Sequence, residues 1–378
     1  MTETKLPSNR SDTAPDGRSG APPCYAALDL GTNNCRLLIA SPAGYGFRVV
    51  EAFSRIVRLG DGLSRTGRLD PAAMDRAMAA LKICAEKVRR RRAVRVQAVA
   101  TQACRSAQNG GEFVARVEQE TGLRLRIISP REEAQLSVAG CVGLLDRSED
   151  AALVVDVGGG STELSWVDLR DSSLDAGRAP TPPHRLPIRA WLSIPVGVVT
   201  LAERFPEARP ADRAWFRAMV EHVRGYIEAF ARAEPLRPAF EQGRAHLIGT
   251  SGAITSLAGL HLGLKRYERG RIDGLWLGRE DCEVAAERLL VLTPEGRAAE
   301  PCIGPDRADL VLAGAAILQA VQEVWPCPRV RVADRGLREG LLLSLMAERG
   351  RKRRRRRDGQ GRGGRSGDPP KPARAAAE

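Results

Sequence analysis

The segment at 153–164, LVVDVGGGSTEL, constrains the fold more than any other part of this 378-residue chain. Its first three residues are apolar and mostly β-branched, which predicts a buried strand ending at Asp156. The glycines at 158–160 permit a tight turn whose amide groups can point at phosphate oxygens. Two sets of side chains then alternate through 162–167, which is strand periodicity. A Rossmann or Walker loop would open a helix here, and neither motif occurs, so the segment predicts strand, phosphate-binding turn, strand.

A second copy of this pattern lies near the N-terminus. Residues 25–34, YAALDLGTNN, again form an apolar run that ends in Asp-x-Gly, and a strand-like run follows at 36–40. Because Asp-Gly is common in ordinary turns, one copy would be weak support, but two copies in the same strand context are much stronger. They suggest two halves of like topology that face each other across a cleft.

A third strand-to-glycine turn, HLIGTSG at 246–252, precedes an expected helix at 253–260. The N-terminus of a helix offers free N–H groups to an anion. The three turns together supply the residues that we expect to contact phosphate: Gly31, Thr32, Asn33, Gly158, Gly159, Gly160, Ser161, Gly249, Ser251 and Gly252.

The composition indicates a soluble globular protein of about two domains. At 43% hydrophobic residues the chain can bury a sizeable core, and an apolar stripe from Trp215 to Phe230 predicts a long core helix over 211–233. No apolar run approaches the ~20 residues of a membrane-spanning helix, and the N-terminus lacks the apolar region of a secretory signal. The eight cysteines are scattered without a CxxC pair, so we expect reduced thiols and a cytoplasmic location.

The net charge of +13 is concentrated at the C-terminus. Residues 351–357, RKRRRRR, are followed by a stretch rich in Gly and Pro, so 348–378 is expected to be a disordered basic tail. The tail has no aromatic residue to stack on bases and would hold nucleic acid or another polyanion by charge alone. Residues 1–23, rich in Pro, Gly, Ser and Asp, are expected to be a disordered leader.

The motifs DLGTNN and DVGGGSTE resemble the two phosphate motifs of the superfamily that holds actin, sugar kinases and the heat-shock chaperone ATPases. Within it the chain is most similar to the exopolyphosphatase / guanosine pentaphosphate phosphatase family, with further matches at 100–109, 127–140, 248–259 and 333–340. These matches fall in the family's order over roughly 24–346. The resemblance implies an α/β fold of two ribonuclease H-like domains, 24–131 and 132–335, facing across an interdomain cleft, with a closing helix at 336–347 that returns to the first domain.

The resemblance also bears on the helix expected to begin at Pro130, in the sequence PREEAQLSVAG. Composition alone explains Glu132 and Glu133 as acids that complement the helix dipole. In the family, however, the glutamate immediately before Ala is the proposed general base, which implies that role for Glu133 and leaves Glu132 as the alternative. Arg105 follows the strand expected at 94–100, and its position together with the family match favours a phosphate contact over a solvated helix residue.

The acids of the two motifs are candidate metal ligands. Asp156 and Glu163 flank the second turn, and with Asp29 they can place hard oxygen ligands together. Such a site suits Mg²⁺, with Mn²⁺ as a substitute and a monovalent cation such as K⁺ as a further candidate. In the mechanism that the resemblance implies, the turns bind terminal phosphates, Glu133 directs water, and Arg105 helps to neutralise the phosphoryl group.

The expected function is a phosphohydrolase that removes terminal phosphate from inorganic polyphosphate or guanosine pentaphosphate. Two alternatives stay open: an ATPase or kinase of the same fold, and a sensor of low activity that binds guanosine tetra- or pentaphosphate. Besides the substrate, the expected partners are a second copy of the chain in a homodimer and a polyanion or nucleic acid on the basic tail, with no membrane.

The sequence departs from the family at two points. Arg335 stands where many members have the first Gly of Asp-Gly-Ala-Leu-Arg-Glu-Gly, which predicts an extra cation near the cleft. Longer members carry additional C-terminal domains with a metal-site His/Asp pattern. This chain contains four histidines and no such domain, which argues against a wide, multi-site grip on long polyphosphate.

Overall fold

The computed structural model describes residues 22–347 except 45, 172–173, 175–182 and 208–210. The leader predicted at 1–23 lies almost entirely outside these residues, and the basic tail predicted at 348–378 lies wholly outside them. The strands are β1 (Tyr25–Leu30), β2 (Asn34–Ala43), β3 (Gly46–Ile56), β4 (Arg95–Ala100), β5 (Leu125–Ile127), β6 (Ala151–Val157), β7 (Thr162–Asp168), β8 (Ile188–Ile194), β9 (Ala245–Thr250), β10 (Trp276–Gly278) and β11 (Arg329–Ala333).

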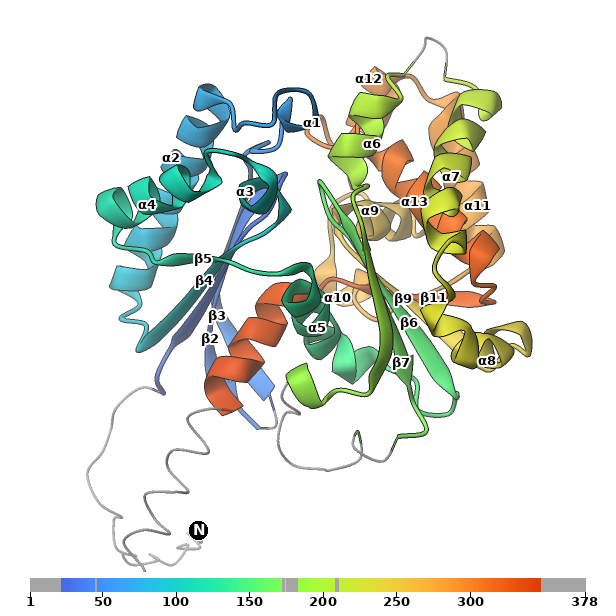
Figure 1. The fold of residues 1–378 in the computed structure, drawn as a ribbon, viewed down its shortest axis with the longest axis horizontal. Coiled ribbons are helices and arrows are strands. Elements are labelled where there is room, and N and C mark those ends of the chain that lie inside the picture. The colour runs from blue at the N-terminus through green and yellow to red at the C-terminus, as the bar shows by residue number, and fades with distance from the viewer. Residues whose placement is uncertain (1–21, 45, 172–173, 175–182, 208–210, 348–378) are drawn as a thin grey trace, which may run out of the picture.

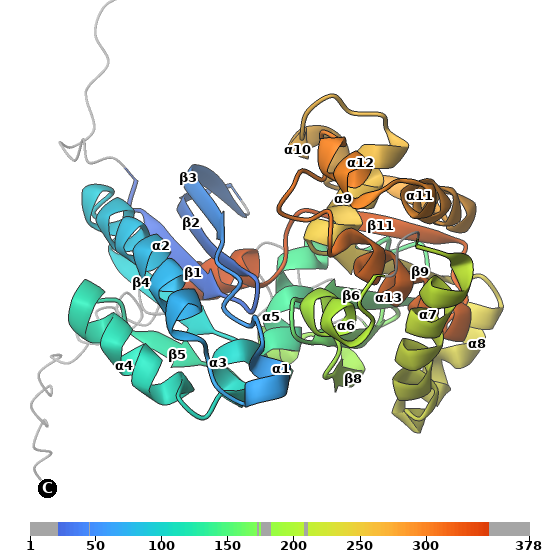
Figure 2. The same ribbon diagram turned by 90° about the horizontal axis from the view of Figure 1, so that it is seen from above.

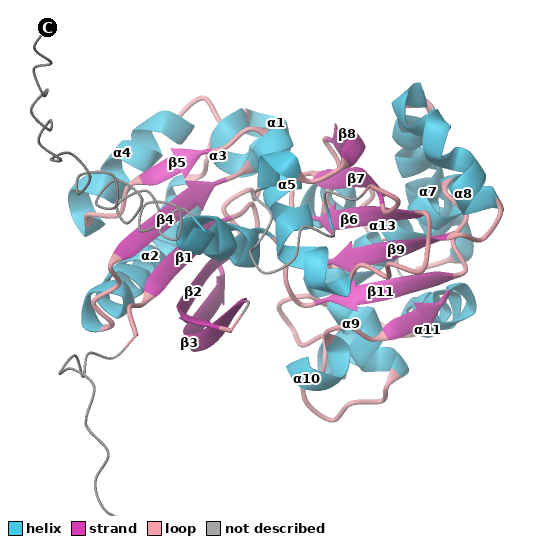
Figure 3. Cartoon of the chain, turned by 90° about the horizontal axis from the view of Figure 1, so that it is seen from below, coloured by secondary structure: helices cyan, strands magenta, loops and turns pink. Residues whose placement is uncertain are grey.

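Helices cover both sheets that these strands form (Figures 1 and 3). The helices are α1 (Leu63–Thr66), α2 (Pro71–Arg90), α3 (Gln102–Ser106), α4 (Gly110–Thr121), α5 (Pro130–Cys141), α6 (Val198–Arg204), α7 (Arg213–Glu228), α8 (Arg237–Glu241), α9 (Gly252–His261), α10 (Arg269–Ile272), α11 (Arg279–Val291), α12 (Pro294–Ala299) and α13 (Val311–Val324). One further helix occupies 337–347 at the end of the described chain.

The two sheets repeat one topology. The first has the strand order β3-β2-β1-β4-β5 and the second β10-β11-β9-β6-β7-β8. In the first, β1, β2 and β3 form an antiparallel meander and β4 joins parallel to β1; in the second, β6, β7 and β8 form the meander and β9 joins parallel to β6. This repeat confirms the α/β fold of two like domains, which we name the first and second domain after their sheets.

Each domain buries its own core between sheet and helices. In the first domain β1 and β4 pack against α2 and α4, and in the second the sheet packs against a layer that includes α7, α9, α11 and α13 (Figure 1). The sequence signals of α2 are those expected: Asp70 accepts a hydrogen bond from the N–H of Ala73 at 3.1 Å, and Pro71 occupies the first turn, where its missing N–H costs nothing.

The helix predicted over 211–233 is shorter than expected. α7 ends at Glu228, and after Phe230 the chain forms a 3₁₀ segment, Ala231–Leu236, that contains Pro235. Phe230 leaves the helix because its ring stacks on Trp166 of β7, with ring centroids 5.3 Å apart. The aromatic contact and the proline together explain why the apolar residues keep helical spacing beyond the last residue of the helix.

The helix 337–347 leaves the second domain and packs on the first. Leu337, Leu341, Leu342 and Leu345 join one apolar cluster with residues of β1, β2 and β4. Where this helix crosses α5 the two backbones nearly touch, since a Cβ added to Gly140 or Gly340 would lie 2.0 Å from a carbonyl oxygen of the other segment. The domain boundary expected between residues 131 and 132 stays a prediction, and it would fall inside α5.

Two further observations concern the surface and the thiols. In the described part of the chain no helix is both long enough and apolar enough to cross a membrane. All eight cysteines are free thiols, and seven of them are buried.

Candidate active site

A cavity of about 380 Å³ lies between the two domains, at the ends of β1, β6 and β9. The two predicted phosphate turns, the start of α9, the start of α5 and the segment that leads into the helix 337–347 all contribute to its walls. Figure 2 shows the first domain and the second domain on opposite sides of this cleft. The carboxyl ends of parallel strands meet here, which is the usual place for a ligand in an α/β fold.

The first and second phosphate turns pack directly against each other. A Cβ added to Gly159 would lie 3.0 Å from the Cβ of Thr32, and one added to Gly160 would lie 2.8 Å from the Thr32 hydroxyl. Glycine is therefore required in the second turn for contact between the domains as well as for approach of a ligand. Among the described residues, the N–H groups of Thr32, Asn33, Gly159 and Gly160 donate to no backbone carbonyl, which leaves them available to an anion.

Each turn is preceded by an aspartate whose cross-strand partner is charged. Asp29 of β1 pairs in register with Arg36 of β2, and Asp156 of β6 pairs with Glu163 of β7. All four residues line the cavity. Ser161 and Ser193 both donate hydrogen bonds to Oε1 of Glu163, at 2.8 Å each.

The acids of the cavity are held in an environment that disfavours their charge. Burial raises the pKa of Asp29 to about 6, although Arg36 acts in the opposite direction. Burial, aided by the negative charge of Asp156, raises the pKa of Glu163 to about 7. Burial and then Glu163 raise the pKa of Glu133 well above its usual range, while Arg105 lowers it. So many carboxyls in one cavity favour a bound cation.

Glu133 and Glu132 point to different surroundings, although they are neighbours in the first turn of α5. Glu133 is buried, lines the cavity, and accepts a hydrogen bond from Nη1 of Arg105 at 3.1 Å. Glu132 accepts two hydrogen bonds from Arg126, at 2.6 and 2.7 Å, and does not line the cavity. The structure therefore brings Glu133 to the phosphate turns and leaves Glu132 outside.

Arg105 lies behind Glu133, where it does not line the cavity. The same guanidinium nitrogen that contacts Glu133 also donates to the carbonyl oxygen of Ile128 at 2.7 Å. In this arrangement Arg105 contacts the Glu133 carboxyl from outside the cavity wall, and the direct phosphate contact expected for it stays a prediction.

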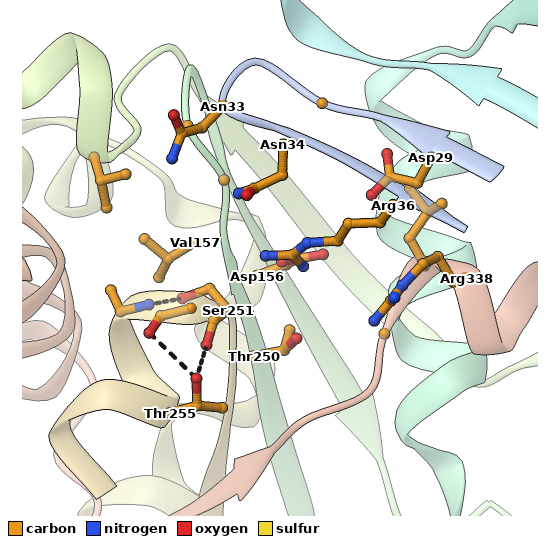
Figure 4. A pocket seen from close by; sticks show the side chains of 18 of the residues that line it. Asp29, Asn33, Asn34, Arg36, Asp156, Val157, Thr250, Ser251, Thr255 and Arg338 are labelled. Carbon is orange, nitrogen blue, oxygen red and sulfur yellow. Dashed lines mark hydrogen bonds between the residues drawn. The ribbon is translucent and has the colours of Figure 1, made fainter. Parts of the chain in front are cut away.

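Four arginines that were not expected from the sequence line the cavity: Arg36, Arg269, Arg307 and Arg338. Arg269 is ion-paired with Asp334 and Glu339, whereas the other three, Arg36, Arg307 and Arg338, are not. Figure 4 shows Arg36 and Arg338 extending into it from β2 and from the helix 337–347, with Asp156 across from them. None of the three forms a hydrogen bond or ion pair through its side chain with another described residue. One feature of the sequence points to Arg36: it lies on the same face of the strand after the first turn as Asn34 and Leu38.

The third turn contributes differently from the prediction. Ser251 and Gly252 line the cavity, but Gly249 does not. Gly249 is instead a packing position, because a Cβ there would lie 2.9 Å from the Ile254 side chain. Ser251 caps α9 with φ of 144°, a strained value for a residue with a side chain and one often found at functional sites.

Arg335 lines the cavity, but its charge is already paired. Its guanidinium forms an ion pair with Asp273, with Nε 3.0 and 3.1 Å from the two carboxylate oxygens. The extra cation expected from this departure is therefore largely neutralised by its neighbour.

The predicted metal ligands are only partly assembled. Among the described residues no three His, Cys, Asp or Glu side chains are placed to hold a metal ion together. All three acids line the cavity, Asp29 from the first domain and the other two from the second. Glu163 accepts two serine hydrogen bonds on Oε1, and Asp156 accepts one from Ser137 at 2.7 Å, so Asp29 and Asp156 are the less occupied pair. Because Mg²⁺ is usually held by one or two carboxylates plus substrate phosphates and water, these two acids fit a metal that is completed by a phosphate ligand.

Known proteins resemble this chain in sequence and in fold. Residues 38–349 match the Ppx/GppA phosphatase family. The chain belongs to this family. It is 31% identical over 334 residues to a Mycobacterium tuberculosis protein named Exopolyphosphatase 2, and the match covers 85% of this chain and 98% of the relative. Membership in the Ppx/GppA family makes the chain a phosphohydrolase.

Solved structures of the Ppx/GppA family share the fold. The Ppx/GppA family member from Aquifex aeolicus is 26% identical, with a TM-score of 0.68 over 86% of this chain and 98% of that one. An exopolyphosphatase from Cytophaga hutchinsonii is 23% identical, with a TM-score of 0.73 over 85% of this chain and 97% of that one. The two-domain actin-like architecture expected from the sequence is thereby confirmed.

Proposed function

We propose that this protein removes terminal phosphate from inorganic polyphosphate by attack of water. The observation that carries the proposal is the position of the Glu133 carboxyl, in the wall of a cavity that is also lined by the phosphate-binding turns and by Arg36, Arg307 and Arg338, which have no side-chain partner among the described residues. The relative named Exopolyphosphatase 2 supports polyphosphate as the substrate class.

The cavity offers two kinds of group to a terminal phosphate. The free N–H groups of the two turns can donate hydrogen bonds to its oxygens, and the guanidinium groups of Arg36, Arg307 and Arg338 supply positive charge. The N–H groups are held in place by the backbone of the turns before substrate arrives. They can therefore stabilise the charge that develops on the transferred phosphoryl group without reorganisation.

Glu133 is the proposed general base. A water held by its carboxyl attacks the terminal phosphorus, the proton passes to Glu133, and the anhydride oxygen leaves with the electron pair of the broken P–O bond. Arg105 keeps this carboxyl oriented and favours its charged form. The Glu163 carboxyl, held by its two serines, lines the same cavity.

Phosphatases of this family generally use a divalent metal. We propose that Asp29 and Asp156 would hold it, and that it would supply positive charge to offset the negative charge of the phosphate. Glu163, the third ligand predicted, is assigned instead to the electrostatics of the base, because its Oε1 is taken by Ser161 and Ser193.

The test is a comparison of substrates. Purified protein with Mg²⁺ receives long-chain polyphosphate, guanosine pentaphosphate or ATP in parallel, and orthophosphate release is measured. We expect the highest kcat/KM on polyphosphate. A higher value on guanosine pentaphosphate would reassign the substrate, release from ATP alone would support the ATPase alternative, and tight binding of guanosine pentaphosphate without release from any substrate would support the sensor.

A further inference from the structure

The two domains touch at a second place besides the helix 337–347, on the side of the cleft where α1 faces α6 (Figures 1 and 2). The guanidinium of Arg58 in the first domain contacts both carboxylate oxygens of Asp309 in the second, at 2.9 and 3.2 Å. Beside this pair, Glu203 of α6 accepts hydrogen bonds from the N–H of Gly62, at 2.9 Å, and from the hydroxyl of Ser64. Two separate polar connections therefore cross the cleft here.

Arg58 is attached to the first phosphate turn through its backbone. Its N–H donates to the carbonyl oxygen of Asn33 at 3.1 Å, and the N–H of Gly60 donates to that of Thr32 at 2.9 Å. Arg58 has a φ of 49°, in the left-handed region that is unfavourable for a residue with a side chain. In this strained conformation, the backbone of Arg58 is hydrogen-bonded to the turn while its side chain reaches across the cleft.

Asp309 is attached to the other side of the same site. It lies two residues after Arg307, whose guanidinium carbon is 3.7 Å from the position of a Cβ at Gly252. The N–H groups of Leu310 and Val311 both donate to the carbonyl oxygen of Arg307, at 2.9 and 3.0 Å, so the segment is wound into the start of α13. A force on Asp309 is therefore transmitted to Arg307 over a short, hydrogen-bonded stretch.

We propose that Arg58, Ser64, Glu203 and Asp309 form an interdomain latch that holds the first phosphate turn and Arg307 at the separation a polyphosphate end requires. These four are positioning residues, since none of them lines the cavity. The prediction for catalysis rests on the proposed function. The prediction for domain closure does not.

Loss of the Arg58–Asp309 pair is expected to shift the equilibrium between closed and open domains only modestly, and to weaken both polar connections together. The side chains of Arg58 and Asp309 are 35% and 50% exposed, and such a pair contributes about 1 kcal/mol at most, equivalent to about fivefold in an equilibrium constant. If both connections form only when the two domains close, then breaking the Arg58–Asp309 pair must also make the hydrogen bonds of Glu203 form less often. A passive surface ion pair would leave the Glu203 connection unchanged.

The Gly62 amide proton provides a readout that does not depend on activity, because its hydrogen bond to Glu203 itself crosses the cleft. Hydrogen exchange of Gly62 is measured in substrate-free wild type, Arg58→Gln, Asp309→Asn and the double variant. We expect exchange about fivefold faster in all three variants, with the double variant no faster than either single one. The variant Arg116→Gln, which breaks an exposed ion pair with Asp75 inside the first domain, serves as control and should match wild type.

The second measurement is steady-state hydrolysis of polyphosphate by the same proteins. The latch predicts a KM about fivefold higher with a smaller change in kcat, and recovery when the charges are exchanged in Arg58→Asp/Asp309→Arg. Gly62 exchange that stays at the wild-type rate in every variant overturns the latch. If wild type releases no phosphate from polyphosphate, the proposed function fails, while the exchange experiment still decides the latch.

Discussion

The hairpins β1–β2 and β6–β7 are built alike but carry opposite charges. Both place an aspartate at the end of the first strand, before a phosphate turn, and both pair it in register with a charged residue of the second strand. The partner is Arg36 in the first domain and Glu163 in the second. In the proposed function, the two similar hairpins have different roles: the first supplies a cation to bind phosphate, and the second supplies an acid beside the proposed base.

The turns of the two hairpins differ for a related reason. The first contains Thr32 and Asn33, whereas the second contains the glycines at 158–160. Because the second turn packs on Thr32, a side chain at Gly159 or Gly160 would collide with it. The contact with Thr32 therefore explains why the second motif contains glycines where the first motif contains side chains.

The largest expected effect tests the acidic side of the comparison. Glu133→Gln removes the proposed base and should lower kcat by about 10²–10⁴-fold, with substrate affinity little changed. Phosphate release and equilibrium binding measure the two quantities separately. Glu132→Gln is the matched control, since Glu132 pairs with Arg126 outside the cavity and should retain most activity. A greater loss in the control would exchange the two assignments.

The next effect tests the cationic side. Arg36→Gln should raise KM for polyphosphate about 10–100-fold, because hydrogen bonds to charged groups contribute about 1.5–3 kcal/mol, and should change kcat less. Steady-state kinetics provide the measurement. Arg55→Gln, on the neighbouring strand over the ring of Phe53 and not in the cavity, is the control. Equal losses in kcat and in 1/KM would show that the division of tasks between the hairpins is wrong.

A third experiment asks whether the hairpins share the metal. Asp29→Asn and Asp156→Asn should each raise the Mg²⁺ concentration needed for half-maximal activity by about tenfold or more. Titration of Mg²⁺ into protein treated with chelator gives this value. Activity that persists in excess chelator would contradict a metal requirement, and a response from one aspartate alone would place the metal in a single domain.

The smallest effect is on stability. Since Glu163 has a folded pKa of about 7 against a usual value near 4.5, the folded state keeps a proton that the unfolded state releases between these values. Its contribution to stability therefore falls as the pH rises from about 4.5 to 7 and stays low above pH 7. We expect Glu163→Gln to raise Tm by a few °C at pH 8 and hardly at all at pH 4.5, in thermal unfolding without metal. An equal gain at both pH values would exclude titration as the cause.

The sequence predicted those parts of the site that are local. Asp29 and Asp156 were recognisable because each ends an apolar strand before a turn, and Glu133 because it lies in a short family motif at a helix start. The fold followed from the duplication of the strand–turn–strand pattern. These signals need no knowledge of distant segments.

The sequence failed where a role depends on what comes together in space. Arg307 enters the cavity from a segment without any motif that marked it. Arg338 lies in the family match at 333–340, but its entry into the cavity depends on how the closing helix packs. Gly249 and Arg105 were assigned to phosphate by position, yet one fills a close contact with Ile254 and the other contacts Glu133. The role of Glu163 as a third metal ligand stays a prediction, and its hydrogen bond with Ser193 of another strand, β8, could not be read from the local motif.

The helix 337–347 has a consequence for biosynthesis. Its leucines cover the face of the first sheet that β1, β2 and β4 expose on the side away from α2, yet they are the last described residues of the chain to be made. Domains usually fold as they leave the ribosome, N-terminal parts first. Here the first domain must wait, with apolar residues such as Tyr25 and Leu38 uncovered, until the second has been synthesised. If synthesis stopped before residue 337, the released chain would lack the helix that covers the sheet of its first domain, although that domain is synthesised first.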